Sequence, residues 1–365
     1  MKVIFITREG YRLPGARIRC YHFAQELSQQ GIETQVLSFS DTLGGKDGEE
    51  EREMDTLRRL YLNWRALRFI RENSLGSILF LQRIHYHALG PLIASFKYHL
   101  PLVVDMDDWE IKEDLKFWGP FSNSKGEMFW RLVIKRAQVI LAASHFLKDF
   151  LSRYGKKVYY LPSAVDTEKF LPLSTRGRRR NFVFSWIGTL HRKDNMENIE
   201  FITRCFEKLR KRYPEILLEI CGDGLYRKET EKILYRKKGV NFRGWISPQK
   251  IPQYLSQVDV GLLPLIQELK FNLAKSPVKL FEYMSCGIPV VASKRGEVLH
   301  FIKDGVNGFL ASSEEEFIKK MEILVCNPFL RKKMGKEARK TAVEKASLKK
   351  WGEKLKEILL AHFSH

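Results

Sequence analysis

Short apolar runs recur along the whole chain and are separated by segments with helical periodicity. In the first half they cover residues 3–7, 34–39, 78–81, 102–105, 139–143 and 158–161, and in the second half 182–187, 217–221, 240–242, 260–263 and 288–292. Apolar strands that alternate with helices are typical of a parallel sheet covered by helices on both faces. The sequence therefore predicts an α/β fold with two doubly wound, Rossmann-like parallel-sheet domains.

The length of the chain is consistent with two domains. A domain typically has ~100 to 200 residues, and this chain has 365, of which 44% are hydrophobic. We place the first domain at residues 1–165, a hinge or linker at 166–180 and the second domain at 181–346, because the basic stretch 176–180 has no apolar period. Residues 347–365 form a last helix. Open sheets bind ligands at the carboxyl ends of their strands, so we expect the active site in a cleft between the domains.

One helix of the second domain is predicted to bind a phosphate group. Ser276 suits the N-cap and Pro277 the first helical position, so the backbone amides of Val278 and Lys279 should point out of the helix start. These amides and the positive end of the helix dipole attract anions. Side chains that can turn toward a core are Leu280, Tyr283 and Met284, and Gly287 ends the helix before a buried strand.

Lys279 and Glu282 lie three residues apart on one face of this helix. Because helix caps occur in many proteins, an ordinary helix on which these two residues pair at the surface is the alternative interpretation.

Residues 276–293 resemble the C-terminal signature of the family 4 retaining glycosyltransferases, which have the GT-B fold. In that family two glutamates, separated by seven residues, contact a nucleotide-sugar. The second glutamate binds the ribose hydroxyls, and the resemblance assigns this role to Glu282. The first contacts the donor sugar, and its position carries Ala274; Lys275 and Glu268 are the nearby candidates to replace it.

Other segments resemble the same family in the expected order along the chain. The segment WIGTL at 186–190, followed by Arg192 and Lys193, is similar to a strand, a glycine turn and a diphosphate-binding lysine. The arginine that often follows the glycine is replaced by Thr189. Segments 219–224, 240–244 and 259–264 are similar to later strand ends, and 162–170 to the family's hinge. The resemblance implies a donor site formed by Gly188, Arg192, Lys193, Gly222, Gly224, Arg243, Pro277, Val278, Lys279, Leu280 and Glu282.

The resemblance also implies that the first domain binds the acceptor and that the last helix returns to it. A loop that begins at residue 8 joins the first strand to a predicted helix at 17–30, which Gly31 closes. In the family this loop approaches the acceptor and the transferring phosphate. Gly15 would allow close approach of the backbone, and Arg17 or Arg19 would add charge. A structural turn with solvated arginines is the alternative.

Acidic residues follow the strand that ends at Asp105. Asp107 and Asp108 occupy the place of a His-Asp pair that meets the donor sugar and the acceptor in the family, so the resemblance implies a catalytic role for them, beside Lys193 and Glu282. Paired aspartates after a strand also bind Mg²⁺ or Mn²⁺ in glycosyltransferases of the other large fold, GT-A. We expect no metal, because the phosphate-binding residues are in the opposite domain. A helix or turn cap is the structural alternative for each aspartate.

The chain has a formal net charge of +20, which predicts an acidic partner. We expect no nucleic acid, because no nucleic-acid module is recognisable. An anionic membrane surface fits better, because a helical stripe is apolar and flanked by arginines. The apolar residues are Leu57, Leu60, Tyr61, Trp64 and Leu67, and the arginines are Arg58, Arg59, Arg65, Arg68 and Arg71. A core-packing helix with a solvated outer face would have the same pattern.

The remaining features favour a cytoplasmic protein, peripheral at most to the inner face of a membrane. The five cysteines have no Cys-x-x-Cys spacing and are expected to be reduced core residues. No run approaches ~18 apolar residues and the N-terminus leads directly into a strand, so we expect neither a membrane span nor a signal peptide.

These observations predict a glycosyltransferase that transfers a sugar from a nucleotide-sugar to a hydroxyl acceptor, which we expect to be a cell-envelope glycan or a lipid-linked saccharide. By resemblance it retains the anomeric configuration and needs no cofactor or metal. Two alternatives remain: a GT-B UDP-sugar epimerase, and a non-catalytic basic protein that binds nucleotides or other anions.

Overall fold

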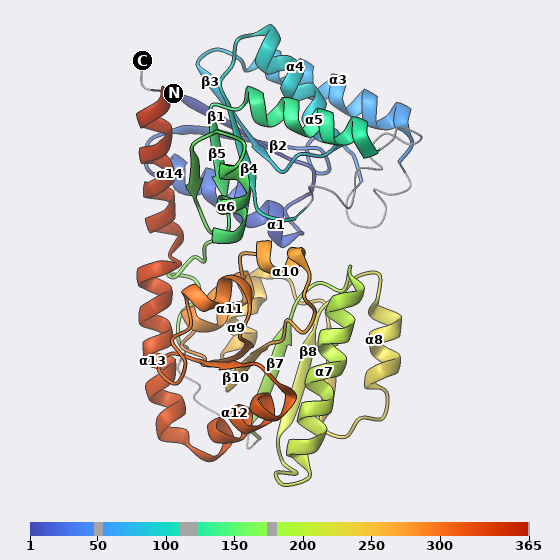
Figure 1. Cartoon of the computed structure of the whole chain (residues 1–365), viewed down its shortest axis with the longest axis vertical. Coiled ribbons are helices and arrows are strands. Elements are labelled where there is room, and N and C mark those ends of the chain that lie inside the picture. Colours follow the sequence, from blue (N-terminus) through green and yellow to red (C-terminus); the bar gives the residue numbers. More distant parts are fainter. Residues whose placement is uncertain (47–53, 110–122, 174–180, 364–365) are drawn as a thin grey trace. The chain divides into compact units, whose positions relative to one another are not determined.

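The computed structural model describes residues 1–46, 54–109, 123–173 and 181–363. The chain divides into two compact units (Figure 1). The first comprises Met1–Ala164, Leu273–Ser276 and Leu348–His365, and the second Val165–Asn272 and Pro277–Ser347. Residues 174–180 of the predicted hinge or linker at 166–180, which include the whole basic stretch 176–180, lie outside the described residues.

The first unit contains a six-stranded parallel sheet of order β2-β1-β3-β4-β5-β6. Its strands are β1 Lys2–Thr7, β2 Glu33–Ser38, β3 Ser77–Gln82, β4 Leu102–Met106, β5 Val139–Ala142 and β6 Val158–Tyr160. All six apolar runs predicted for this domain are confirmed as strands, with ends that differ by one residue. The central strands are buried along their length, as expected for a sheet with helices on both faces.

The second unit contains another six-stranded parallel sheet, of order β12-β11-β10-β7-β8-β9. Its strands are β7 Val183–Ile187, β8 Leu217–Cys221, β9 Val240–Gly244, β10 Val260–Leu263, β11 Val290–Ser293 and β12 Phe309–Ala311. The predicted α/β fold with two doubly wound parallel sheets is therefore confirmed. Sequence reasoning missed β12, a strand of three buried apolar residues.

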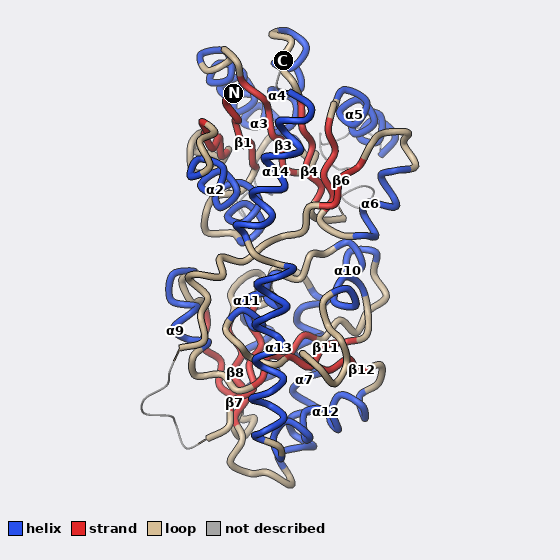
Figure 2. Tube along the Cα trace, turned by 90° about the vertical axis from the view of Figure 1, so that its left-hand side faces the viewer, coloured by secondary structure: helices blue, strands red, loops and turns tan. Residues whose placement is uncertain are grey.

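The helical elements of the first unit cover both faces of its sheet (Figure 2). They are α1 Pro14–Ala16, a π-helical turn at Arg17–His22, α2 Phe23–Gln29, α3 Thr56–Glu72, a 3₁₀ turn at Tyr86–Ala88, α4 Leu89–Lys97, α5 Asn123–Arg136, α6 His145–Ser152 and α14 Leu348–Phe363. The helix predicted at 17–30 starts earlier, because Pro14 occupies its first turn. Gly31 closes it with a φ of 83°. Helix α14 packs against α2.

The second unit is built around two apolar cores, one on each face of its sheet. Its helical elements are α7 Lys193–Arg210, α8 Arg227–Leu234, 3₁₀ turns at Pro248–Lys250 and Gly296–His300, α9 Ile251–Leu255, α11 Val278–Ser285, α12 Glu314–Cys326 and α13 Pro328–Lys345. Helix α10, Lys270–Ala274, crosses the boundary between the units.

Four of the five cysteines are buried, as predicted, but Cys326 is exposed at the end of α12, 3.0 Å from the hydroxyl of Tyr213. Among the described residues, no helix is both long and apolar enough to cross a bilayer.

Candidate functional site

Helix α11 begins one residue later than predicted. Pro277 is its N-cap, with a ψ of 74° that is not helical, and Val278 is the first helical residue. The predicted N-cap, Ser276, has a different role: its hydroxyl accepts a hydrogen bond of 2.9 Å from the Ser163 N–H. The first backbone bond of the helix runs from the Leu280 N–H to the Pro277 carbonyl, at 2.9 Å. The amides of Val278 and Lys279 therefore precede the first helical hydrogen bond, at the positive end of the helix.

The inner face of α11 packs as predicted. Leu280, Tyr283 and Met284 are buried, and the Tyr283 hydroxyl donates to the Ser185 carbonyl at 3.0 Å. Glu282 is only 8% exposed, so its side chain is buried and does not lie at the surface. Gly287 ends the helix with a φ of 71°. The next strand starts at Val290, two residues later than predicted.

Two glycine turns lie side by side where β7 and β8 end. A Cβ atom on Gly222 would come 2.3 Å from the Gly188 carbonyl oxygen. A Cβ atom on Gly188 would come 2.7 Å from the Trp186 ring and 2.6 Å from Lys279 Nζ. The ammonium of Lys279 lies 4.2 Å from the centroid of the Trp186 ring. Only glycine at both positions lets the two turns and the lysine of α11 come together.

Gly224 and Arg243 also lie near the strand ends of this sheet. Gly224 has a φ of 145°, and a Cβ atom there would clash with the backbone of Leu190. Arg243 donates to the Glu219 carboxylate at 2.5 Å, and this hydrogen bond raises the pKa of Arg243. Since Glu219 is fully buried, the guanidinium of Arg243 compensates a carboxylate inside the sheet.

Arg192 and Lys193, predicted to bind the diphosphate, have different environments. Arg192 Nε donates to Asp194 at 2.9 Å, and its guanidinium lies 3.6 Å from the ring centroid of Phe271 in α10. These contacts fix the Arg192 side chain. Lys193 is the first residue of α7; its side chain is 69% exposed and lies 3.6 Å from Glu197. An exposed pair of this kind restrains the lysine weakly.

Ala274 stands where the family has its first glutamate, and it is buried in α10. This position therefore offers no polar side chain to a donor sugar. Of the two residues considered as substitutes, Glu268 pairs with Arg295 at 3.0 Å and Lys275 is half-buried.

In the first unit, the predicted acceptor loop differs from expectation. Gly15 lies inside α1, where a Cβ atom would come 2.8 Å from Arg83 Nη2. Arg17 is buried and donates to the Arg12 carbonyl at 3.0 Å, so it fixes the loop that precedes it. Arg19 is fully buried and binds the Asp105 carboxylate through Nε, at 2.8 Å, and through Nη2. Arg19 therefore neutralises a core carboxylate, and the expectation that it adds charge to an open loop is wrong.

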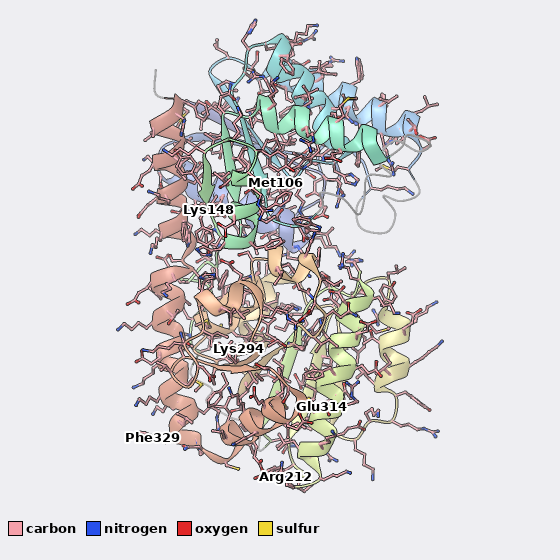
Figure 3. All side chains as sticks on the ribbon, in the orientation of Figure 1. Met106, Lys148, Arg212, Lys294, Glu314 and Phe329 are labelled. Carbon is pink, nitrogen blue, oxygen red and sulfur yellow. The ribbon has the colours of Figure 1, made fainter. Side chains whose placement is uncertain are left out.

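Arg83 is the centre of a polar cluster at the carboxyl ends of β1, β3 and β4. It donates to both carboxylate oxygens of Asp107, at 2.6 and 3.1 Å. Glu9 and Asp108 lie 3.6 and 3.8 Å from its guanidinium. Met106, labelled in Figure 3, is the last residue of β4 and marks this end of the sheet. Burial acts to raise the pKa of Asp107, but the Arg83 charge and its hydrogen bonds outweigh burial, so the pKa is lowered.

Sequence reasoning missed Arg83 and its neighbour Gln82. Gln82 is the last residue of β3, and its Nε2 donates to Asp107 at 3.2 Å. Arg83 follows with a φ of 60°, which is unusual for a residue other than glycine. Two polar residues where a buried strand ends, next to the strand that leads to Asp107, were the available signal.

The aspartates and histidines near this cluster have distinct contacts. Asp108 Oδ1 accepts from the Trp109 N–H at 2.9 Å, whereas the N–H groups two and three residues on, which a capping residue would bind, lie outside the described residues. His87 is buried against the Gln82 carbonyl, and burial lowers its pKa to about 3. His87 is thus a neutral packing residue at physiological pH.

Four of the five apolar residues of the predicted stripe on α3, Leu57, Leu60, Tyr61 and Trp64, are exposed, and Leu67 is half-buried. Leu57 is 77% exposed and Trp64 is 55% exposed. The rings of Tyr61 and Trp64 stack on each other, with their centroids 6.0 Å apart. The helix instead packs against α4 through a different face, with Leu62, Asn63, Ala66 and Ile70 buried (Figure 1). The alternative in which the stripe packs in the core is therefore wrong for these exposed residues.

Comparison with known proteins identifies both halves of the chain. A family model described as Glycosyltransferase Family 4 matches residues 14–169, and one described as Glycosyl transferases group 1 matches residues 181–327.

Curated relatives are distant and only partly covered. The GDP-mannose-dependent alpha-(1-6)-phosphatidylinositol monomannoside mannosyltransferase of Mycolicibacterium smegmatis is 24% identical over 237 residues, which are 61% of this chain and 62% of that protein. The UDP-Gal:alpha-D-GlcNAc-diphosphoundecaprenol alpha-1,3-galactosyltransferase of Escherichia coli is 26% identical over 225 residues, 56% of this chain and 54% of that protein. The chain thus matches less than two thirds of the length of these relatives.

Solved structures share the fold. Anabaena HepE in complex with UDP and glucose has a TM-score of 0.72 at 17% identity, covering 99% of this chain and 100% of that chain. Sucrose-phosphate synthase from Thermosynechococcus elongatus has a TM-score of 0.77 at 12% identity, covering 100% and 99%. The fold is that of GT-B glycosyltransferases.

Proposed function

Because the chain belongs to the family 4 (group 1) glycosyltransferases, we propose that it transfers a sugar from a nucleotide-sugar to a hydroxyl group of a saccharide or lipid-linked acceptor, with retention of anomeric configuration. The observation that carries the donor half of this proposal is the convergence of Gly188, Gly222 and the start of α11 where β7 and β8 end. Ligands of doubly wound sheets bind at such strand ends.

In the proposed donor complex each group has a defined task. Glu282 accepts hydrogen bonds from the ribose hydroxyls. The amides of Val278 and Lys279 and the cations of Arg192 and Lys193 stabilise the diphosphate. As the bond between the sugar and the diphosphate breaks, negative charge grows on the leaving phosphate oxygen, and preorganised positive groups stabilise that charge.

Transfer then needs no protein nucleophile. The acceptor hydroxyl attacks the anomeric carbon on the side of the leaving group and forms the new carbon–oxygen bond. Its proton passes to the departing phosphate oxygen. We place the acceptor hydroxyl at Asp107 and Asp108, since Arg83 keeps the Asp107 carboxylate ionised and oriented in the first unit.

The acceptor class is supported by the curated relatives and by the surface of α3. Two of those relatives are named for acceptors that are themselves lipid-linked, a phosphatidylinositol monomannoside and a diphosphoundecaprenol-linked sugar. Helix α3 is complementary to an anionic membrane surface. Its exposed apolar residues, which can enter the interface, are Leu57, Leu60, Tyr61 and Trp64, and its exposed cations on the same side are Arg68 and Arg71. A cytoplasmic enzyme that works at this surface would meet such an acceptor.

A binding screen tests the donor half directly. Thermal shift with UDP, GDP, ADP and their sugars should show stabilisation by one nucleotide, because a ligand at ~100 times its Kd adds about 2.7 kcal/mol. Release of that nucleoside diphosphate from its sugar, faster with an added lipid-linked saccharide, is the expected activity. Stabilisation by none of the nucleotides would contradict the proposed function.

A further inference from the structure

Helix α13 carries lysines along its outer face. Residues four apart on a helix lie on the same face, and this spacing is met by Lys332, Lys336 and Lys340, with Lys333 beside them. All four side chains are exposed, and none of them forms an ion pair or a hydrogen bond with another of the described residues. We call these four residues the lysine row. The opposite face of the helix is buried, through Met334, Gly335, Ala338 and Ala342.

The stability of α13 does not explain the lysine row. Like charges four residues apart destabilise a helix, and positive charges near its start oppose the helix dipole. The first turn of α13 has no acidic residue, and Lys332 and Lys333 follow it closely. The preceding helix, α12, has the arrangement that the dipole favours, with Glu314, Glu315 and Glu316 in its first turn. Negative charges supplied by a partner would remove the repulsion within the lysine row.

The surroundings make the lysine row a narrow strip. Helical periodicity places Glu337 and Glu344 along one side of it. On that side a cavity of about 620 Å³ lies between α13 and residues 299–307, with Lys340, Glu337 and Val306 in its wall. A bilayer surface presents phosphates over a wide area and would meet these glutamates as well as the lysines. A single protein segment, ~10 Å wide if helical, can lie along the lysine row alone.

Exposed apolar side chains stand at both ends of the lysine row. Phe329, labelled in Figure 3, is the second residue of α13 and is 80% exposed. Val343, ~21 Å further along the helix, is 43% exposed. Protein interfaces combine apolar contacts with complementary charge. A protein segment can supply carboxylates for the lysines and apolar side chains for the two ends, whereas the phosphates of a nucleic acid supply only charge.

We propose that the outer face of α13 is a docking site for an acidic segment of a partner protein. Carboxylates that repeat every ~6 Å in this segment lie opposite the lysine row, and its apolar side chains contact Phe329 and Val343. The docking site needs neither a sugar donor nor an acceptor, so it goes beyond the proposed function. It also gives a use to part of the net charge of +20, which a nucleotide-sugar alone does not require.

Fluorescence anisotropy on the full chain tests the proposal. The probe is a labelled helical peptide with glutamate at every fourth position and a leucine near each end, and the same peptide with glutamine in place of glutamate is the neutral probe. The wild type should bind the acidic peptide much more tightly than the neutral one, and this binding should weaken as salt rises. Replacing Lys336 and Lys340 together with glutamate should weaken the acidic peptide by at least about 10-fold.

Helix α8 of the same unit offers a matched control. Lys228 and Lys232 are exposed and four residues apart, so replacing both with glutamate changes the net charge equally. This variant should bind the acidic peptide nearly as the wild type does. Phe329→Gln keeps every charge, and it should weaken the acidic peptide without changing the salt dependence. Thermal melting of each variant checks that it is folded.

Three results would overturn the proposal. The first is a wild type that does not bind the acidic peptide, which would leave the lysine row as a solvated face. The second is an equal loss in the α13 and α8 variants, which would assign the binding to net charge. The third is tighter binding of phosphatidylglycerol vesicles or of a single-stranded oligonucleotide that only the α13 variant loses, which would assign the lysine row to phosphates.

Discussion

The guanidinium of Arg83 binds both carboxylate oxygens of Asp107, at 2.6 and 3.1 Å, although the two residues are 24 positions apart in the sequence. Glu9 lies 3.6 Å from the same guanidinium. One arginine thus compensates several carboxylates at the carboxyl ends of neighbouring strands, and it does so with a positive φ of 60°. The free energy of unfolding that this arginine contributes should therefore depend on the protonation of the carboxylates, and so on pH.

Replacing Arg83 with glutamine should destabilise the first unit at neutral pH. Asp107 and Glu9 both have lowered pKa values in the folded protein: burial acts against ionisation, but it is outweighed by the charge of Arg83, together with that of Arg8 in the case of Glu9. A lowered pKa adds stability above the unfolded values of about 3.9 and 4.3, and this stability is lost as the pH falls through the folded pKa values. Removing the partner of a buried carboxylate costs ~3 to 5 kcal/mol.

The expected result is a difference in unfolding free energy between Arg83→Gln and wild type that is large at pH 7 and shrinks below about pH 4 as the carboxylates become protonated. Urea unfolding across this pH range measures it. Arg131→Gln, which removes an arginine from an exposed pair with Glu127 in the same unit, is the control and should cost less than ~1 kcal/mol at every pH. A pH-independent loss in Arg83→Gln would show that the arginine acts through packing alone.

The fold was predictable because its signal is local. Strands β1, β3 and β5 of the first sheet each contain a contiguous apolar run, so their positions can be inferred without knowing their neighbours. Strand β12 was missed although its three residues are apolar and buried. The predicted start of α11 was one residue too early because the Ser276 hydroxyl accepts a hydrogen bond from the Ser163 N–H instead of capping the helix. Ser163 is more than 100 residues away in the sequence, so a local capping preference gives no sign of this contact.

The candidate site was less predictable because its contacts join distant elements. The sequence marks Gly188 as a turn, but nothing local shows that Lys279 from another element fills the adjoining space. From the sequence, Arg19 was likewise a candidate cation in a loop. In the structure its guanidinium is buried and binds the Asp105 carboxylate of β4. Residue types were informative about which chemistry is present, and only the fold decides which charges remain available for a ligand.

Glu282→Ala should weaken the nucleoside and the nucleoside diphosphate by the same factor. Glu282 is only 8% exposed on α11. We propose that its carboxylate accepts hydrogen bonds from the ribose hydroxyls, which both ligands carry. Losing a charged acceptor of this kind costs ~1 to 3 kcal/mol, or roughly 5- to 150-fold in affinity. Calorimetry with uridine and UDP, or the corresponding pair for another base, measures both. Glu268→Ala is the control and should leave the nucleoside unchanged; an effect of Glu282→Ala on the diphosphate alone would exclude ribose binding.

Transfer should be insensitive to EDTA. The carboxylates considered as metal ligands in the first unit already have protein partners: Asp105 binds Arg19, and Asp107 binds Arg83 and Gln82. A divalent cation would have to displace these donors, so we expect the leaving diphosphate to be stabilised by protein amides and cations instead. Release of nucleoside diphosphate from its sugar is measured with and without EDTA. Loss of activity that Mg²⁺ or Mn²⁺ restores would require a metal-dependent mechanism.

The exposed face of α3 should bind anionic vesicles. Leu57 and Trp64 project from the helix, and Arg68 and Arg71 are exposed one and two turns further along the same face. Apolar side chains that enter the interface, together with arginines near anionic headgroups worth about 1 kcal/mol each, should give binding that weakens as salt rises. Flotation with vesicles of phosphatidylcholine and phosphatidylglycerol measures it.

Two changes on α3 and one matched control decide whether this face is responsible. Replacing Arg68 and Arg71 with glutamate should lower vesicle binding by at least roughly 30-fold, since two attractive charges of about 1 kcal/mol each are removed and two repulsive ones introduced. Replacing the exposed Lys332 and Lys336 of α13 with glutamate changes the net charge equally and should have a much smaller effect.

Trp64→Gln should weaken the binding that persists at high salt. Nucleotide affinity should remain unchanged in the two α3 variants, because α3 belongs to the first unit and the donor residues belong to the second. Equal loss in the α3 and α13 variants would mean that net charge alone attracts the protein, and a saccharide acceptor free of lipid would then be the better proposal.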